Sequence, residues 1–300
     1  MYPVEPIPPD RKLASLTQIK DIEDVHKKII SGYCIKAMAS DPYGHPIFAV
    51  QDGKIGSLIV YETNDEQILR KIGAGYHEIE SITFDSSYNM TMTSDKAAEH
   101  KIMKYNLKGD EVLSACIEEV KKLYSIACMG NGCMAVSLVQ SDGYPAIRVY
   151  DQQGERIKLT ICRTEQGTLY FTKPQYLVST GETLVVGDVG TKNLRGFSTQ
   201  TESQLLWTYK MDMPRGMCVD GAGNICACDF RNNRVTLLTA EGALIGHSLT
   251  GLSKPQQIAI NHNKLFTLDM GRSTSYRIST HCLFKTPKAK RKSISQPEWQ

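Results

Sequence analysis

Aspartates recur at or just after the end of an apolar run, about forty residues apart, and this spacing constrains the fold more than any other feature of the chain. The steps between successive aspartates are 43, 47, 46, 41 and 40 residues, for Asp52, Asp95, Asp142, Asp188, Asp229 and Asp269. Each run is short and is followed by turn-forming residues, which predicts a β-strand that ends in a turn. A period of this length is typical of propeller blades with four strands and differs from the periods of helical repeats.

The clearest repeat extends from Pro214 to Leu249. It contains four short apolar runs separated by polar turns, at Gly216–Val219, Ile225–Cys228, Val235–Leu238 and Ala243–Leu249. Four antiparallel strands in about 36 residues form a sheet that is too small to be stable alone. We therefore expect each sheet to stack on its neighbours and to bury both faces.

The same repeat contains the pattern P-x-G-x-x-x-D-x-x-G-N-I-x-x-x-D-x-x-N-N-R-V, from Pro214 to Val235. This pattern resembles the NHL repeat, as found at the C-terminus of tripartite-motif ubiquitin ligases. The resemblance implies an all-β fold, a six-bladed β-propeller with four-stranded antiparallel blades, over residues 12–284. Residues 1–11 are then a proline-rich linker and residues 285–300 a basic, disordered tail.

The last repeat has three clear strands, Gln257–Ile260, Leu265–Leu268 and Ser275–Thr280, and an uncertain fourth. An N-terminal strand could complete this blade and close the ring, which would protect the exposed sheet edges. We predict that Leu13–Lys20 is that strand. The alternative is that His281–Phe284 fills the edge.

Composition excludes several classes of protein. No apolar stretch approaches the roughly 18 residues of a membrane helix, and the N-terminus lacks the apolar core of a signal peptide. The nine cysteines include no CxxC pair, and most lie inside apolar runs, including Cys34, Cys128, Cys133, Cys218, Cys226 and Cys228. We expect structural thiols in a reducing compartment, and a cytoplasmic, monomeric propeller that does not contact membranes.

The formal net charge of +3 conceals an uneven distribution. Residues after Phe284 carry a net charge of +4, so that the propeller itself is near −1. The run KAKRKS at 288–293 has three interpretations: a nuclear signal, an electrostatic arm for RNA or lipid, or a solvated tail.

The connections after the recurring aspartates should converge on one face of the propeller. They carry cations, polar groups and aromatic rings that could bind an acidic peptide or a phosphate backbone. The candidate binding residues are Lys54, Lys96, His100, Tyr144, Arg148, Lys192, Arg195, Arg231, Asn232, Arg272 and Tyr276. By contrast, the resemblance implies that Asp229 and Arg234 form an internal pair that braces a turn.

We expect this face to bind a protein partner without catalysis, as the NHL domain of a tripartite-motif ligase recognises its substrates. The alternative is selective binding of single-stranded or hairpin RNA for post-transcriptional repression. A third possibility is a metal-dependent propeller lyase or lactonase, but the seven histidines fall at different places in their repeats and do not predict a metal ring. We expect no enzyme activity, metal or cofactor, because the sequence contains no ring-finger zinc ligands and no recognisable catalytic motif.

Overall fold

The computed structural model describes residues 23–30, 34–41, 45–52, 55–62, 67–73, 78–96, 99–181, 183–199, 204–249, 252–261, 264–270 and 276–282. The predicted linker at 1–11, the predicted closing strand at Leu13–Lys20 and the basic tail at 285–300 lie outside these residues.

Five antiparallel sheets each consist of four strands that are consecutive in the sequence. The first contains β2 (Cys34–Ser40), β3 (Pro46–Asp52), β4 (Ile55–Glu62) and β5 (Gln67–Gly73). The second contains β6 (Ile79–Phe84), β7 (Met90–Lys96), β8 (Glu99–Tyr105) and β9 (Glu111–Cys116). The third contains β10 (Val120–Cys128), β11 (Met134–Gln140), β12 (Pro145–Tyr150) and β13 (Ile157–Ile161).

The fourth contains β14 (Pro174–Ser179), β15 (Thr183–Asp188), β16 (Asn193–Ser198) and β17 (Leu205–Lys210). The fifth contains β18 (Pro214–Val219), β19 (Ile225–Asp229), β20 (Arg234–Leu238) and β21 (Leu244–Ser248). A further antiparallel sheet combines the two ends of the described chain, in the order β1 (Glu23–Ile30), β24 (Tyr276–Cys282), β23 (Lys264–Met270) and β22 (Pro255–Asn261).

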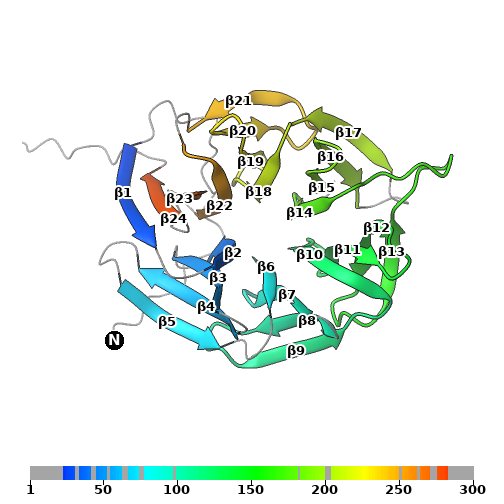
Figure 1. Ribbon diagram of the computed structural model, residues 1–300, viewed down its shortest axis with the longest axis horizontal. Helices are drawn as coiled ribbons and strands as arrows, with labels where there is room; N and C mark the ends of the chain where they lie inside the picture. The colour runs from blue at the N-terminus through cyan, green and yellow to red at the C-terminus, as the bar shows by residue number, and fades with distance from the viewer. Residues whose placement is uncertain are drawn as a thin grey trace, which may run out of the picture.

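The sheets are arranged around a central axis, with β2, β6, β10, β14, β18 and β22 nearest the centre (Figure 1). This arrangement confirms the prediction of an all-β propeller with four-stranded antiparallel blades. The recurring aspartates lie within two residues of the end of the second strand of each repeat, as at Asp188 in β15 and Asp229 in β19. In the composite sheet, β1 pairs with β24 in antiparallel register, with Lys28 opposite Ile278.

The middle strands are buried on both faces, whereas the outer strands alternate between half-buried and exposed residues. Every residue of β15, TLVVGD, is buried because the sheet is covered on both faces by neighbouring sheets. In β17, LLWTYK, half-buried and exposed residues alternate. The core therefore lies between the sheets: Val185 and Leu194 of one sheet pack against Ile225 and Leu238 of the next.

The described cysteines are free thiols, and their burial differs from one to the next. Cys226 and Cys228 are fully buried on β19 and pack in one apolar cluster, as expected for two positions on the same face of a strand. Cys133 is also buried. The expectation of a buried thiol is wrong for Cys34, which is exposed at the start of β2. An apolar run does not fix burial at its own terminal residue, where the strand emerges from the sheet.

Candidate recognition face and central cavity

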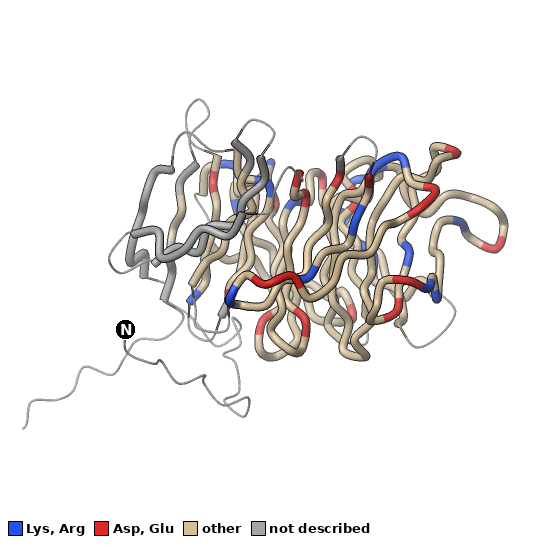
Figure 2. Tube along the Cα trace, turned by 90° about the horizontal axis from the view of Figure 1, so that it is seen from below, with Lys and Arg blue, Asp and Glu red and all other residues tan. Residues whose placement is uncertain are grey.

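Strand direction brings two sets of residues to the same side of the propeller. In each sheet the second strand runs antiparallel to the innermost one, so the innermost strand begins where the second strand ends. We call this side the mouth face, defined by the connections 141–144, 189–192 and 230–233 and by the first residues of β10, β14 and β18. In the side view, acidic and basic residues are interspersed along both edges of the disc (Figure 2).

A central cavity of about 370 Å³ is lined by the innermost strands. The polar residues that line it include Lys36, Glu80, Gln175, Tyr176 and Gln257, each second or third in its strand. Lys36 Nζ lies 3.0 Å from Glu80 Oε1, which joins two neighbouring sheets. Burial opposes the charge of Lys36, but the Glu80 carboxylate outweighs it and raises the pKa of the ammonium group.

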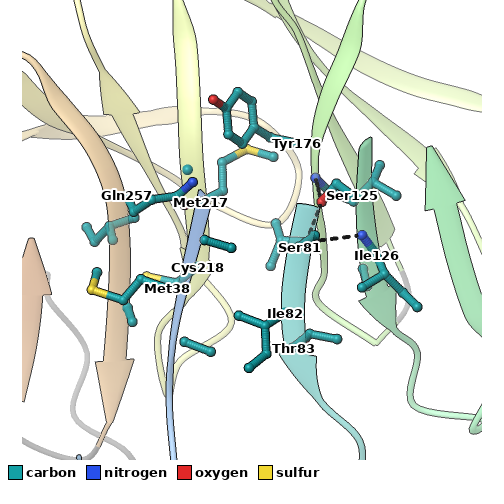
Figure 3. Close-up of a pocket in the computed structure, with 18 of the residues that line it drawn as sticks. Met38, Ser81, Ile82, Thr83, Ser125, Ile126, Tyr176, Met217, Cys218 and Gln257 are labelled. Atoms are coloured by element: carbon teal, nitrogen blue, oxygen red, sulfur yellow. Dashed lines mark hydrogen bonds between the residues drawn. The ribbon is translucent and has the colours of Figure 1, made fainter. Parts of the chain in front are cut away.

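Two serines deeper in the cavity connect three innermost strands (Figure 3). The Ser81 and Ser125 hydroxyl oxygens are 3.2 Å apart. Ser81 Oγ accepts a hydrogen bond from the Ile126 amide at 3.3 Å, and Ser125 Oγ accepts one from the Leu177 amide at 3.2 Å. These hydroxyls satisfy backbone groups at free strand edges, so we assign them to the scaffold.

The aspartates at the ends of second strands are anchors for the turns that follow them. Arg234 Nε donates to Asp229 Oδ2 at 3.1 Å, and Asn232 Nδ2 contacts both Asp229 oxygens, at 2.9 and 2.8 Å. This is the geometry that bracing of a turn requires. Asn232, a candidate binding residue, is thus engaged within its own turn.

Two more candidate residues are held by the same kind of contact. Arg195 Nη1 donates to the Tyr170 carbonyl at 2.6 Å and lies 3.7 Å from Asp188, and its side chain is 15% exposed. His100 Nδ1 lies 2.7 Å from Asp95 Oδ1. Their polar ends are directed into the protein rather than toward a partner.

Arg148 and Tyr144 belong to the third sheet and differ in exposure. Arg148 is 5% exposed, and its Nη1 donates to the Glu118 carbonyl at 2.9 Å. It therefore does not belong to an exposed surface, contrary to the sequence-based expectation, because its strand lies between neighbouring sheets. Tyr144 is exposed, and the Arg163 guanidinium lies 4.4 Å from its ring centroid.

Lys192 and Arg231 are exposed and share one carboxylate. Lys192 Nζ lies 2.7 Å from Asp212 Oδ1, and Arg231 Nη1 lies 2.7 Å from Asp212 Oδ2. The hydrogen bond from Lys192, followed by the one from Arg231, lowers the pKa of Asp212. Two cations against one carboxylate leave a local excess of positive charge on the mouth face.

Two of the remaining candidates lie outside the described residues, and the other two stand at strand ends. Lys54 and Arg272 lie outside the described residues. Lys96 ends β7 and Tyr276 begins β24.

Sequence reasoning missed the side chains that connect the face to the cavity. Arg215, the second residue of β18, donates from Nη1 to the Tyr176 hydroxyl of β14 at 3.0 Å. Its guanidinium carbon lies 5.0 Å from the Phe230 ring centroid. The sequence did contain a signal for it. Arg215 is the variable residue of the P-x-G pattern in the repeat, and this position lies at the start of an innermost strand.

The described residues contain no group of three or more His, Cys, Asp or Glu side chains that could hold a metal ion. Nor do they contain a helix long and apolar enough to cross a membrane.

The comparisons with known proteins identify the repeat and the fold. The family model for the NHL repeat matches residues 211–236. A search of curated proteins gave no significant match. The tripartite-motif resemblance is therefore supported at the level of the repeat and not at the level of the ligase family.

Solved structures similar to this chain come from several kinds of propeller. A protein of unknown function from Bacteroides caccae is 12% identical with a TM-score of 0.55, covering 76% of this chain and 86% of that one. A chain of the nidogen/laminin complex is 17% identical with a TM-score of 0.58, covering 75% and 85%. The β-propeller domain of Cps50 (Swd1) from Myceliophteria thermophila is 12% identical with a TM-score of 0.56, covering 88% and 100%. At these identities the likeness is one of fold: this chain is a β-propeller that contains an NHL repeat.

Proposed function

We propose that this protein is a non-catalytic recognition module that binds a protein partner through the mouth face. The observation that carries the proposal is the arrangement around Arg215, Lys192 and Arg231, where cations and the Phe230 ring gather beside the opening of the central cavity. Arginine and aromatic residues are enriched at protein-binding surfaces.

The proposal includes a six-bladed ring closed by the N-terminal strand. The pairing of β1 with β24 and the placement of that composite sheet between the β18–β21 and β2–β5 sheets support it. Closure makes the mouth face rigid, and a rigid surface loses less conformational entropy when it binds.

More specifically, we propose that the module selects substrates for a ubiquitin ligase. This part of the proposal is supported by the match to the NHL repeat at residues 211–236. We also propose a cytoplasmic location, supported by the free cysteine thiols among the described residues. RNA recognition is the competing function, and the following experiment separates it from protein binding.

A photo-crosslinking amino acid introduced at either of two exposed tyrosines tests which face binds and what it binds. Tyr144 lies on the mouth face, and Tyr88 lies in a turn between first and second strands on the opposite face. The two side chains are 42% and 46% exposed, so they form a matched pair. We expect crosslinking in cells to yield protein adducts from position 144 and not from position 88.

The adducts are examined by mass spectrometry with and without ribonuclease. Protein adducts from position 88 alone would contradict the mouth face as the binding surface. If ribonuclease removes the adducts at position 144, the ligand of the mouth face is RNA and not a protein.

A further inference from the structure

Only some of the N–H donors of Arg215 are hydrogen-bonded within the protein. Its Nη1 donates to the Tyr176 hydroxyl at 3.0 Å, whereas its Nε is buried without a hydrogen-bond partner. Within the described part of the chain, Arg215 forms no ion pair. A guanidinium group carries five N–H donors, and leaving donors unmatched in a partly buried place has a free-energy cost. A carboxylate ligand would accept from the remaining guanidinium donors and compensate the positive charge of Arg215.

Tyr176 contributes a second donor at the same point. Its oxygen accepts the hydrogen bond from Arg215, so that the hydroxyl proton can be donated elsewhere. Burial raises the pKa of Tyr176, and this effect outweighs the opposing influence of Arg215. The hydroxyl therefore keeps its proton at neutral pH.

Phe230 fixes the guanidinium from one side. The Arg215 carbon lies 5.0 Å from the ring centroid, and the Phe230 amide donates to the Met213 carbonyl at 3.4 Å. The 230–233 connection is thereby tied to the segment that enters β18. A cation held against an aromatic face is already oriented, which lowers the entropy lost when a ligand binds.

The charges around this pair determine the sign of the ligand. Lys192 and Arg231 share the single carboxylate of Asp212, which leaves an excess of one positive charge. Glu80 is the opposing carboxylate in the cavity, and Lys36 neutralises it at 3.0 Å. An anion at the opening thus meets Arg215 and the surplus cation without an unpaired carboxylate among these groups.

We propose that Arg215 and Tyr176 form a carboxylate-binding site for an Asp or Glu side chain of the protein partner. One carboxylate oxygen accepts from the Arg215 guanidinium and the other from the Tyr176 hydroxyl. Two donors on neighbouring groups, one of them charged, favour a ligand with two acceptor oxygens over a single-atom anion. The inference rests on the proposed function, because it identifies the chemistry that the mouth face recognises.

Binding of two peptide libraries tests the site. Both are fluorescein-labelled, randomised and amidated at the C-terminus, one with a fixed central Glu and the other with a fixed central Gln. By fluorescence anisotropy, we expect the Glu library to bind about tenfold more tightly than the Gln library. Equal affinity for the two libraries would overturn the proposal.

Three variants locate the effect. Arg215→Met should abolish the preference for Glu, and Tyr176→Phe should reduce it by about threefold to tenfold, because each removes one donor. Arg156→Met is the matched control, since Arg156 is an exposed arginine between β12 and β13 on the opposite face. Far-ultraviolet circular dichroism confirms that each variant is folded. A preference for Glu that persists in folded Arg215→Met would refute the assignment.

The possible failures can be told apart. If protein adducts form at position 144 but the two libraries bind equally, the carboxylate site is wrong and the recognition function stands. If neither adducts nor binding is observed, both proposals fail. If the Gln library made with a free C-terminal carboxylate binds better than the amidated Glu library, the assignment to an acidic side chain is also overturned.

Discussion

At the scale of single residues, one position of the repeat serves different purposes in different blades. Asp188 is fully buried and accepts hydrogen bonds from four backbone amides, those of Thr172, Lys173, Gly190 and Thr191, at 2.8 to 3.2 Å. Asp142 follows the corresponding strand of the third sheet and is exposed, and among the described residues it accepts a hydrogen bond only from the Tyr144 amide. An aspartate at the same position of the repeat therefore does not contribute equally to stability in every blade.

We expect Asp188→Ala to lower the free energy of unfolding by about 2 to 4 kcal/mol, because it leaves several buried amide donors without an acceptor. Asp142→Ala is the control and should change it by less than about 1 kcal/mol. Urea denaturation followed by circular dichroism measures both. Similar losses in the two variants would show that bracing does not depend on burial.

At the scale of elements, neighbouring blades are joined by a tryptophan. Trp207 of β17 donates from Nε1 to the Ala240 carbonyl at 2.9 Å, in the turn between β20 and β21 of the next sheet. A Cβ atom added at Gly242 in that turn would overlap the Trp207 indole ring. The indole occupies this place because glycine leaves it open.

Comparison of two glycines isolates this contact. Gly242 has φ +79° and Gly143 has φ +89°, but a Cβ at Gly143 would meet nothing within 4 Å. Both Gly→Ala changes cost about 1 kcal/mol through the left-handed backbone. We expect Gly242→Ala to lower the free energy of unfolding by about 1 to 3 kcal/mol beyond Gly143→Ala, through overpacking. Equal losses in denaturant titrations would argue against the packing role.

The elements were the part of the structure that the sequence predicted best. Turn residues and apolar runs fixed the strands of the repeat from Pro214 to Leu249, and their period predicted sheets of four strands. The sequence did not predict which cations are paired with carboxylates, because the pairing depends on contacts between blades. Asp212 lies before β18 and neutralises Lys192 of the preceding sheet, a pairing that no local pattern records.

At the scale of the whole molecule, the two ends of the described chain meet in one sheet. β1 pairs along its length with β24, from Glu23 opposite Cys282 to Ile30 opposite Tyr276. The closing strand was expected at Leu13–Lys20, which lies outside the described residues, and the strand that pairs with β24 is β1. The sixth-blade edge alternative, His281–Phe284, overlaps β24, which lies between β23 and β1.

Deleting residues 1–30 tests whether β1 closes the ring. Without β1, backbone amides of β24 that face it lose their acceptors and become an exposed edge, so they should exchange hydrogen faster. Amides of β15 and β19, in sheets of consecutive strands, should be much less affected. Hydrogen–deuterium exchange with mass spectrometry on the deleted and full-length proteins measures each strand.

Deletion of residues 1–22 alone is the control, because it keeps β1 and its pairing with β24. If β1 closes the ring, this shorter deletion should leave the protection of β24 unchanged. Loss of β24 protection after the shorter deletion would transfer the closing role to the preceding segment. Unchanged protection after both deletions would mean that the ring is held by contacts between blades and that β1 is dispensable. The comparison therefore assigns closure to a segment of chain, on which the rigidity of the mouth face depends.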